Sequence, residues 1–291
     1  MAKIKLSKTS LYHYWKFAFH SLMFLAVLVI YIINRVQGLS LELFKQFDYT
    51  QIVLLAMWLI FVFEMIFRFF PSKLESMGCQ KIFNRNYKPY VSDKPKKPKN
   101  ISWKRTFAVA LSWIALNSIF GILYFTHIID DGILILISLF YSICDMICIL
   151  FFCPFQTWFM KNKCCNTCRI YNWDYAMICT PLVFIPNIFT WSLVTLSLIL
   201  LIKWEVVLKV RPERFAENTN QSLKCANCTE KLCAHKKQLQ AYLKKFRAMF
   251  EQVEPKPVLP EPSLQNDQTL AEQVSAQIIV SKSTNTKSHS S

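Results

Sequence analysis

Glycine and histidine are scarce in this sequence, and their scarcity excludes several classes of function. The 291 residues include only 4 glycines and 5 histidines. Loops that wrap phosphate groups are built from glycine, so a glycine-built nucleotide site is almost excluded. The sequence contains no G-x-x-x-x-G-K-[ST], G-x-G-x-x-G, G-x-S-x-G or H-E-x-x-H motif. No signature of a nucleotide-dependent enzyme, a serine hydrolase or a zinc protease is therefore present, and whether the chain is an enzyme stays open.

Acidic residues are also few, with 18 Asp and Glu against 34 Lys and Arg, which gives a net charge of +16. Such an excess can attract nucleic acid. Here the basic residues flank long apolar runs, a pattern that the positive-inside rule and anionic lipid explain. We expect the lipid bilayer as a partner, and no nucleic acid.

Long hydrophobic runs dominate the rest of the sequence, which is 53% hydrophobic. Runs of about 18 or more apolar residues indicate membrane spans. The first run is too long for a signal peptide and should remain as a span. The predicted fold class is all-α, a polytopic membrane helical bundle. Its first four spans are 17–36, 51–70, 106–126 and 133–153.

The region 176–209 is apolar over 34 residues and leaves two topologies open. One helix of that length would extend about 51 Å, well beyond a bilayer core of about 30 Å. Pro181 and Pro186 interrupt its first half. We predict a short fifth span or re-entrant arm at 175–186 and a sixth span at 188–208. A single kinked helix, giving five spans and an external C-terminus, is the alternative.

Charge predicts the orientation in the membrane. The loop 71–105 carries ten Lys or Arg residues, so we place it in the cytoplasm. The N-terminus, the Cys loop 153–174 and, with six spans, the C-terminus then lie on the same side. We expect three regions: a bundle at 1–209, a Cys-rich segment with a basic helix at 210–252, and a disordered tail at 253–291.

Cysteines carry the main chemical signal, because cytoplasmic thiols favour metal or redox roles over disulfides. In the first group, Cys165-x-x-Cys168 has a spacing that lets two thiolates reach one metal ion. The second group holds three thiols and an imidazole within eleven residues, enough for one tetrahedral site. The candidate ligands are Cys153, Cys164, Cys165 and Cys168 in the first group, Cys225, Cys228, Cys233 and His235 in the second, and Cys79 in the basic loop. The cofactor is an iron–sulfur cluster or zinc, and cysteines without a ligand role are the alternative.

Two acidic residues fall inside predicted spans, where a charge is costly and suggests function. Glu64 precedes Arg68 by four residues, which predicts an ion pair within one helix. Asp145 lies between Cys144 and Cys148, so this group is a candidate metal or proton path. A hydrogen bond from Asp145 to Asn117 or Ser142 on a neighbouring helix is the alternative.

Three blocks carry a resemblance to a known family: FFCPFQTWFMKNKCCNTCRIYNWDY (151–175), FPSKLESMGCQK (70–81) and RPERFAENTNQSLKCANCTEKLC (211–233). They resemble bacterial Cys-rich multi-pass membrane proteins without an assigned activity. The resemblance implies a bacterial inner-membrane protein and no catalytic residue. A fainter likeness to membrane-anchored polyferredoxins rests on a Cys-Pro at the end of a span, and it transfers no ligand.

The leading hypothesis is a cytoplasmic-membrane protein with a cysteine-ligated metal centre on its inner face. Such a centre would serve electron transfer or redox sensing, with a redox protein or a quinone as partner. A second hypothesis is a scaffold or assembly factor with structural zinc knuckles. A third is a soft-metal transporter that uses Cys144, Asp145 and Cys148.

Overall fold

The computed structural model describes residues 7–37, 49–71, 78–90, 98, 103–161, 168–227, 236–241 and 244. The chain divides into two compact units, Met1–Gln240 and Ala241–Ser291, and the helices and the site lie in the first. Several predicted features lie outside the described residues: the loop 93–99, most of the basic helix, the tail 253–291, Cys164, Cys165, Cys228, Cys233, His235 and the side chains of Cys79 and Cys225.

The prediction of an all-helical fold is confirmed. Within the described residues the regular elements are all helices, with one isolated β-bridge between Pro89 and Asn220. The main elements are α1 (Lys8–Val36), α2 (Tyr49–Phe67), α3 (Gly78–Ile82), α4 (Trp103–Phe125), α5 (Asp131–Leu150), the π-helix η2 (Phe155–Met160), α6 (Asp174–Cys179), the 3₁₀ helix η5 (Thr180–Phe184) and α7 (Ile188–Val210). Short 3₁₀ turns are η1 (Asn84–Asn86), η4 (Tyr171–Trp173), η6 (Pro212–Arg214), η7 (Gln221–Leu223) and η8 (Cys225–Asn227).

Local sequence sets where the long helices begin. The Asp130 side chain accepts a hydrogen bond from the Ile133 N–H and caps α5. Asn187 does the same for α7 through the Phe189 N–H. At its other end α5 stops at Leu150, and Cys153, which we assigned to the fourth span, lies beyond the helix. Pro154 disfavours a helical conformation for the residue before it, in keeping with this early end.

The apolar region 176–209 does not form one kinked helix. α6 and η5 contain six and five residues, Pro186 follows, and Asn187 starts α7 as a separate helix of 23 residues. At the rise of each helix type, α6 and η5 together extend about 20 Å, short of a bilayer core of about 30 Å. The predicted interruption at Pro186-Asn187 is thus present, and the arm before it is too short to count as a span.

Three helices are long and apolar enough to cross a membrane, namely α1, α4 and α5, in the part of the chain that the structure describes. The described part of α2, Gln51–Phe67, is a shorter apolar helix. Many large apolar side chains on these helices are exposed, as along α4, which presents Phe107, Leu111, Ile114, Ile119, Ile122 and Phe125. An exposed apolar face of this length indicates membrane association.

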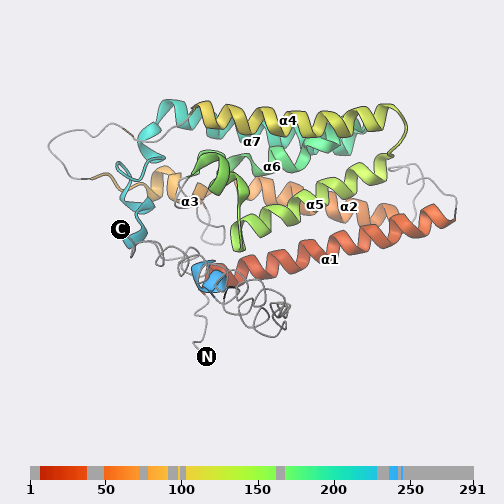
Figure 1. Cartoon of the computed structure of the whole chain (residues 1–291), viewed down its shortest axis with the longest axis horizontal. Coiled ribbons are helices and arrows are strands. Elements are labelled where there is room, and N and C mark those ends of the chain that lie inside the picture. The colour runs from red at the N-terminus through yellow and green to blue at the C-terminus, as the bar shows by residue number, and fades with distance from the viewer. Residues whose placement is uncertain are drawn as a thin grey trace, which may run out of the picture. The chain divides into compact units, whose positions relative to one another are not determined.

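The long helices run lengthwise beside one another in Figure 1, with α1 and α4 in one direction and α2, α5 and α7 in the other. Tyr31 of α1 donates to Asp130 before α5, while Tyr14 packs on Phe151 just after α5, so these two helices are antiparallel. The Lys16–Glu64 contact makes α1 antiparallel to α2 in the same way. The end where α1 and α4 begin and α2, α5 and α7 stop is called the charged end below.

Two glycines allow close packing between these elements. A Cβ on Gly121 of α4 would lie 2.6 Å from the ring of Phe184 in η5. A Cβ on Gly132 of α5 would lie 2.6 Å from the ring of Tyr31 in α1. Any larger residue would push these helices apart.

Asn220 holds two distant segments together at the charged end. It is fully buried, and its Nδ2 donates to the carbonyls of Lys81 and Arg214 at 3.1 and 2.9 Å. Its Oδ1 accepts from the backbone N–H of Ser222 and Lys88. The segment after α7 is therefore attached to the segment that includes α3 and η1.

Candidate functional site

A polar cluster joins four helices inside the bundle. The Glu64 carboxylate of α2 lies 3.0 Å from Lys16 Nζ and 3.1 Å from His20 Nε2, both on α1. The Tyr175 hydroxyl donates to Glu64 Oε2 at 2.9 Å, and His20 Nδ1 bonds to the Ser142 hydroxyl of α5. Glu64 is thus satisfied by groups from α1 and α6.

Arg68 has a different partner from the one we predicted. Its Nη2 lies 2.6 Å from Asp174 Oδ2, with side chains only 7% and 6% exposed, and its guanidinium also stacks over the Tyr175 ring. The predicted Glu64–Arg68 pair is therefore wrong. Tertiary packing brings a closer partner to each residue than spacing along one helix does.

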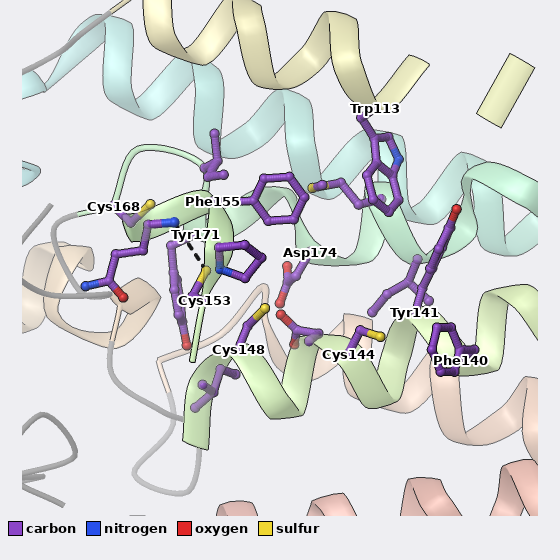
Figure 2. A pocket seen from close by; sticks show the side chains of 17 residues that line it. Trp113, Phe140, Tyr141, Cys144, Cys148, Cys153, Phe155, Cys168, Tyr171 and Asp174 are labelled. Carbon is purple, nitrogen blue, oxygen red and sulfur yellow. Dashed lines mark hydrogen bonds between the residues drawn. The ribbon is translucent and has the colours of Figure 1, made fainter. Parts of the chain in front are cut away.

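One pocket of about 300 Å³ lies beside this cluster, at the end of α5. Four thiols and two carboxylates line it, namely Cys144, Cys148, Cys153, Cys168, Asp145 and Asp174. Aromatic side chains form much of the rest, including Trp113, Phe140, Tyr141, Phe155 and Tyr171 (Figure 2). The predicted grouping of Cys144, Asp145 and Cys148 is thus part of a larger site.

The chain reversal after α5 brings Cys153 back to Cys148, and the two side chains point into the same hollow (Figure 2). The neighbouring Cys148 thiol lowers the pKa of Cys153 to about 6, against the opposing effect of burial. The Gln156 N–H, 3.4 Å from the sulfur, and the Lys236 ammonium act in the same direction. Cys153 is therefore largely thiolate at neutral pH, the form that reacts and binds metals.

The two carboxylates of the pocket have unused acceptors. Asp174 Oδ1 is buried and accepts no hydrogen bond, although Oδ2 pairs with Arg68. Asp145 has no hydrogen bond or ion pair with any described residue. The alternative of a hydrogen bond from Asp145 to Asn117 or Ser142 is not present among the described residues: Asn117 donates to the Trp113 carbonyl, and Ser142 bonds to His20. Both carboxylates thus remain able to take a donor or a cation.

A second ion pair anchors the chain just after Cys168. Arg169 makes a bidentate pair with Glu205 of α7 at 2.5 and 2.6 Å, and Trp173 Nε1 donates to the same carboxylate at 2.7 Å. The Arg169 guanidinium also stacks on the ring of Trp103 at the start of α4. These contacts fix the end of the cysteine loop between α4 and α7.

Only some of the predicted metal ligands fall within the described residues. Cys153 and Cys168 line the pocket, and Cys144, Cys148, Cys153 and Cys179 are free thiols. Across those residues no three His, Cys, Asp or Glu side chains are arranged to hold one ion. A complete metal site would therefore need ligands from the neighbouring cysteine segments.

Described residues next to both predicted cysteine groups lie at this end of the bundle. Lys236, the residue after His235, donates to the Cys148 carbonyl at 2.6 Å. α3, which includes Cys79, packs on η4, which begins three residues after Cys168. The described neighbours of the predicted ligands thus lie around one site.

Sequence reasoning missed several residues of this region, namely Lys16, His20, Asp174, Tyr175, Arg169 and Glu205. Their only sequence signal was polarity next to or within apolar runs, which does not name a partner. Comparison of the chain with protein families, with curated proteins and with solved structures found no match.

Proposed function

We propose that this chain is a multi-pass membrane protein in which cysteines at the charged end hold a metal centre that transfers electrons or senses redox state. The observation that carries the proposal is that residues next to both predicted cysteine groups, Arg169 and Lys236, are anchored beside a pocket lined by four thiols and two carboxylates. Thiolates are soft ligands suited to zinc, copper(I) and iron–sulfur clusters. The four thiols of the pocket all lie between residues 144 and 168, and α5 and the chain after it bring them to one site.

The ligands in this proposal come from three segments of the chain. Two contacts of described residues support it: Lys236, which follows the second predicted group, donates to the Cys148 carbonyl, and Arg169, which follows the first, pairs with Glu205. The proposed ligands are Cys164, Cys165, Cys168, Cys225, Cys228, Cys233 and His235, with Cys79 nearby. Cys153, which lines the pocket beside Cys168, is a further candidate ligand.

The proposed setting is the cytoplasmic membrane of a bacterium, with the charged end inside. Basic residues such as Lys16, Arg105 and Arg169 lie at that end, where the positive-inside rule puts them in the cytoplasm. We include α2 and α7 as further spans. α7 has 23 residues, which is enough for about 34 Å, although Lys203, Glu205 and Lys209 lie near its end.

Soft-metal transport is the second candidate, and it has an observation of its own. Cys144, Asp145 and Cys148 of α5 reach the same pocket as Cys153. A transport role requires that Asp145→Asn lowers metal flux into proteoliposomes while bound metal stays unchanged. A purely structural zinc role, as in a scaffold, predicts bound zinc with neither flux nor redox activity.

Metal analysis with an ultraviolet–visible spectrum on protein purified without oxygen tests the proposal. The variants are Cys165→Ser and Cys228→Ser, one from each cysteine segment, with Cys179→Ser as the matched control. Cys179 is buried in the core and does not line the pocket.

One centre built from both segments predicts iron and sulfide with visible absorbance, lost in both loop variants and kept in the control. Colourless zinc lost only in Cys228→Ser would instead indicate a structural site in the tail. Protein that holds neither iron nor zinc would refute the proposal.

A further inference from the structure

The pocket is too large to serve a bare ion alone. Its volume of about 300 Å³ is at the lower end for pockets that bind small organic molecules, about 300–1,000 Å³. A single water occupies only about 30 Å³ of liquid, and metal ions are of similar or smaller size. The described residues also offer no three-ligand group for an ion. The space therefore fits an organic ligand with a small ring system.

The walls specify the chemistry of that ligand. Trp113 and Tyr141 pack with ring centroids 4.6 Å apart, and Phe155 lies on the other side of Trp113. Flat aromatic walls of this kind suit a planar ring. Phe140, also in the lining, is 51% exposed on the apolar outer surface, which gives a lipid-soluble molecule a route into the site.

The polar groups of the pocket restrict the chemistry of the ligand further. Asp174 Oδ1 is an unpartnered acceptor in a side chain only 6% exposed, and Asp145 faces the same space. A lipid acyl chain offers no donor to these carboxylates. A hydroquinone offers two O–H donors, and its quinone form has the same flat ring.

Two thiols, Cys148 and Cys153, line the pocket beside these carboxylates. Lys236 donates to the Cys148 carbonyl next to them. Both cysteines are free thiols that share one pocket, so the pair is available to form a disulfide bond of about 2 Å. A dithiol and a quinone are matched partners, since each exchanges two electrons and two protons.

We propose that this pocket binds the head group of a membrane quinone, and that Cys148 and Cys153 exchange two electrons with it. The Cys153 sulfur adds to a ring carbon of the quinone. The Cys148 sulfur then attacks the Cys153 sulfur, and the electron pair of the sulfur–carbon bond returns to the ring.

The products are the Cys148–Cys153 disulfide and a hydroquinone. One S–S bond and two O–H bonds form, and the Cys148 S–H bond breaks. The second proton is the one that Cys153 released to water when it became a thiolate, and both protons reach the quinone oxygens through the Asp145 and Asp174 carboxylates. The thiols are oxidised and the quinone is reduced, so no further oxidant or reductant is needed. This exchange does not rest on the proposed metal centre.

Decylubiquinone is the probe, because its fully substituted ring does not retain thiols as stable adducts. The full-length protein is reduced, freed of reductant and mixed with the probe without oxygen. Hydroquinone is measured by absorbance, and the thiol pair by mass spectrometry after alkylation. Cys148→Ser and Cys153→Ser are the test variants, Cys179→Ser is the control, and the metal content of each sample is measured alongside.

We expect one hydroquinone per chain in a single turnover, with a Cys148–Cys153 disulfide. Either test variant should lower hydroquinone formation by about tenfold or more while quenching of tryptophan fluorescence by the probe persists. Trp113→Phe should reduce that quenching. The control should behave as the wild type does.

Absence of hydroquinone from fully reduced, folded wild-type protein would overturn the inference, as would equal formation in Cys153→Ser. A disulfide joining other cysteines, or a lasting adduct with the probe, would also overturn it. The metal measurement separates the two proposals. Metal-free protein that forms the disulfide refutes the metal centre alone, and metal-loaded protein without the exchange refutes the quinone reaction alone.

Discussion

The buried Arg68–Asp174 pair should stabilise the fold far more than an exposed pair of the same charges. Its atoms are 2.6 Å apart and its side chains are 7% and 6% exposed. Asp174→Asn removes the charge and leaves the guanidinium buried without its counter-ion. Breaking a buried pair in this way costs about 3–5 kcal/mol.

The matched control is Asp130→Asn. Asp130 faces Arg35 at 3.7 Å, with the Arg35 side chain 72% exposed and the Asp130 side chain 40% exposed, and exposed pairs contribute about 0–1 kcal/mol. Asn can still cap α5 through its side-chain oxygen. The control therefore removes one exposed charge and keeps the cap of α5.

The assay is thermal unfolding in one detergent at one heating rate, followed by tryptophan fluorescence. At about 2–4 °C per kcal/mol, Asp174→Asn should lower Tm by about 10 °C, and Asp130→Asn by about 2 °C or less. The double variant Arg68→Met/Asp174→Leu should recover most of the loss, because no charge is then left unpaired. Equal small shifts for the two single variants would refute the reasoning.

Two further predictions concern Cys153 and Asn220. The rate of Cys153 alkylation, read by mass spectrometry of its peptide, should stay high from pH 8 down to about pH 6 and fall below that, because the pKa of Cys153 is lowered to about 6. Cys148→Ala removes the thiol that lowers this pKa and should move the midpoint of the pH profile upward. An unchanged midpoint would contradict this. Asn220→Ala removes four hydrogen bonds made by a fully buried side chain, so proteolysis between residues 210 and 228 should become faster. The control Asn34→Ala, at the far end of α1, should not change this rate. Equal cleavage of the two variants would argue against Asn220 as the residue that attaches this segment.

The helices themselves were predictable from the sequence. The apolar runs predicted α1, α2, α4 and α5 to within a few residues at most ends, although α1 begins nine residues before the predicted span. The pair Pro186-Asn187 predicted the interruption before α7. Cys144 and Cys148 were expected on one helical face, because residues four apart always share a face, and both line the pocket.

The partners of the buried charges were decided only by tertiary structure. Along one helix, Glu64 and Arg68 are natural partners, yet Lys16 of α1 and Asp174 of α6 lie closer to them. Hydrophobicity depends on each residue and its neighbours, so one sequence reveals where helices form. Ion pairs depend on which helix faces meet, and residues 48 or 106 positions apart in the chain meet only once the bundle has packed.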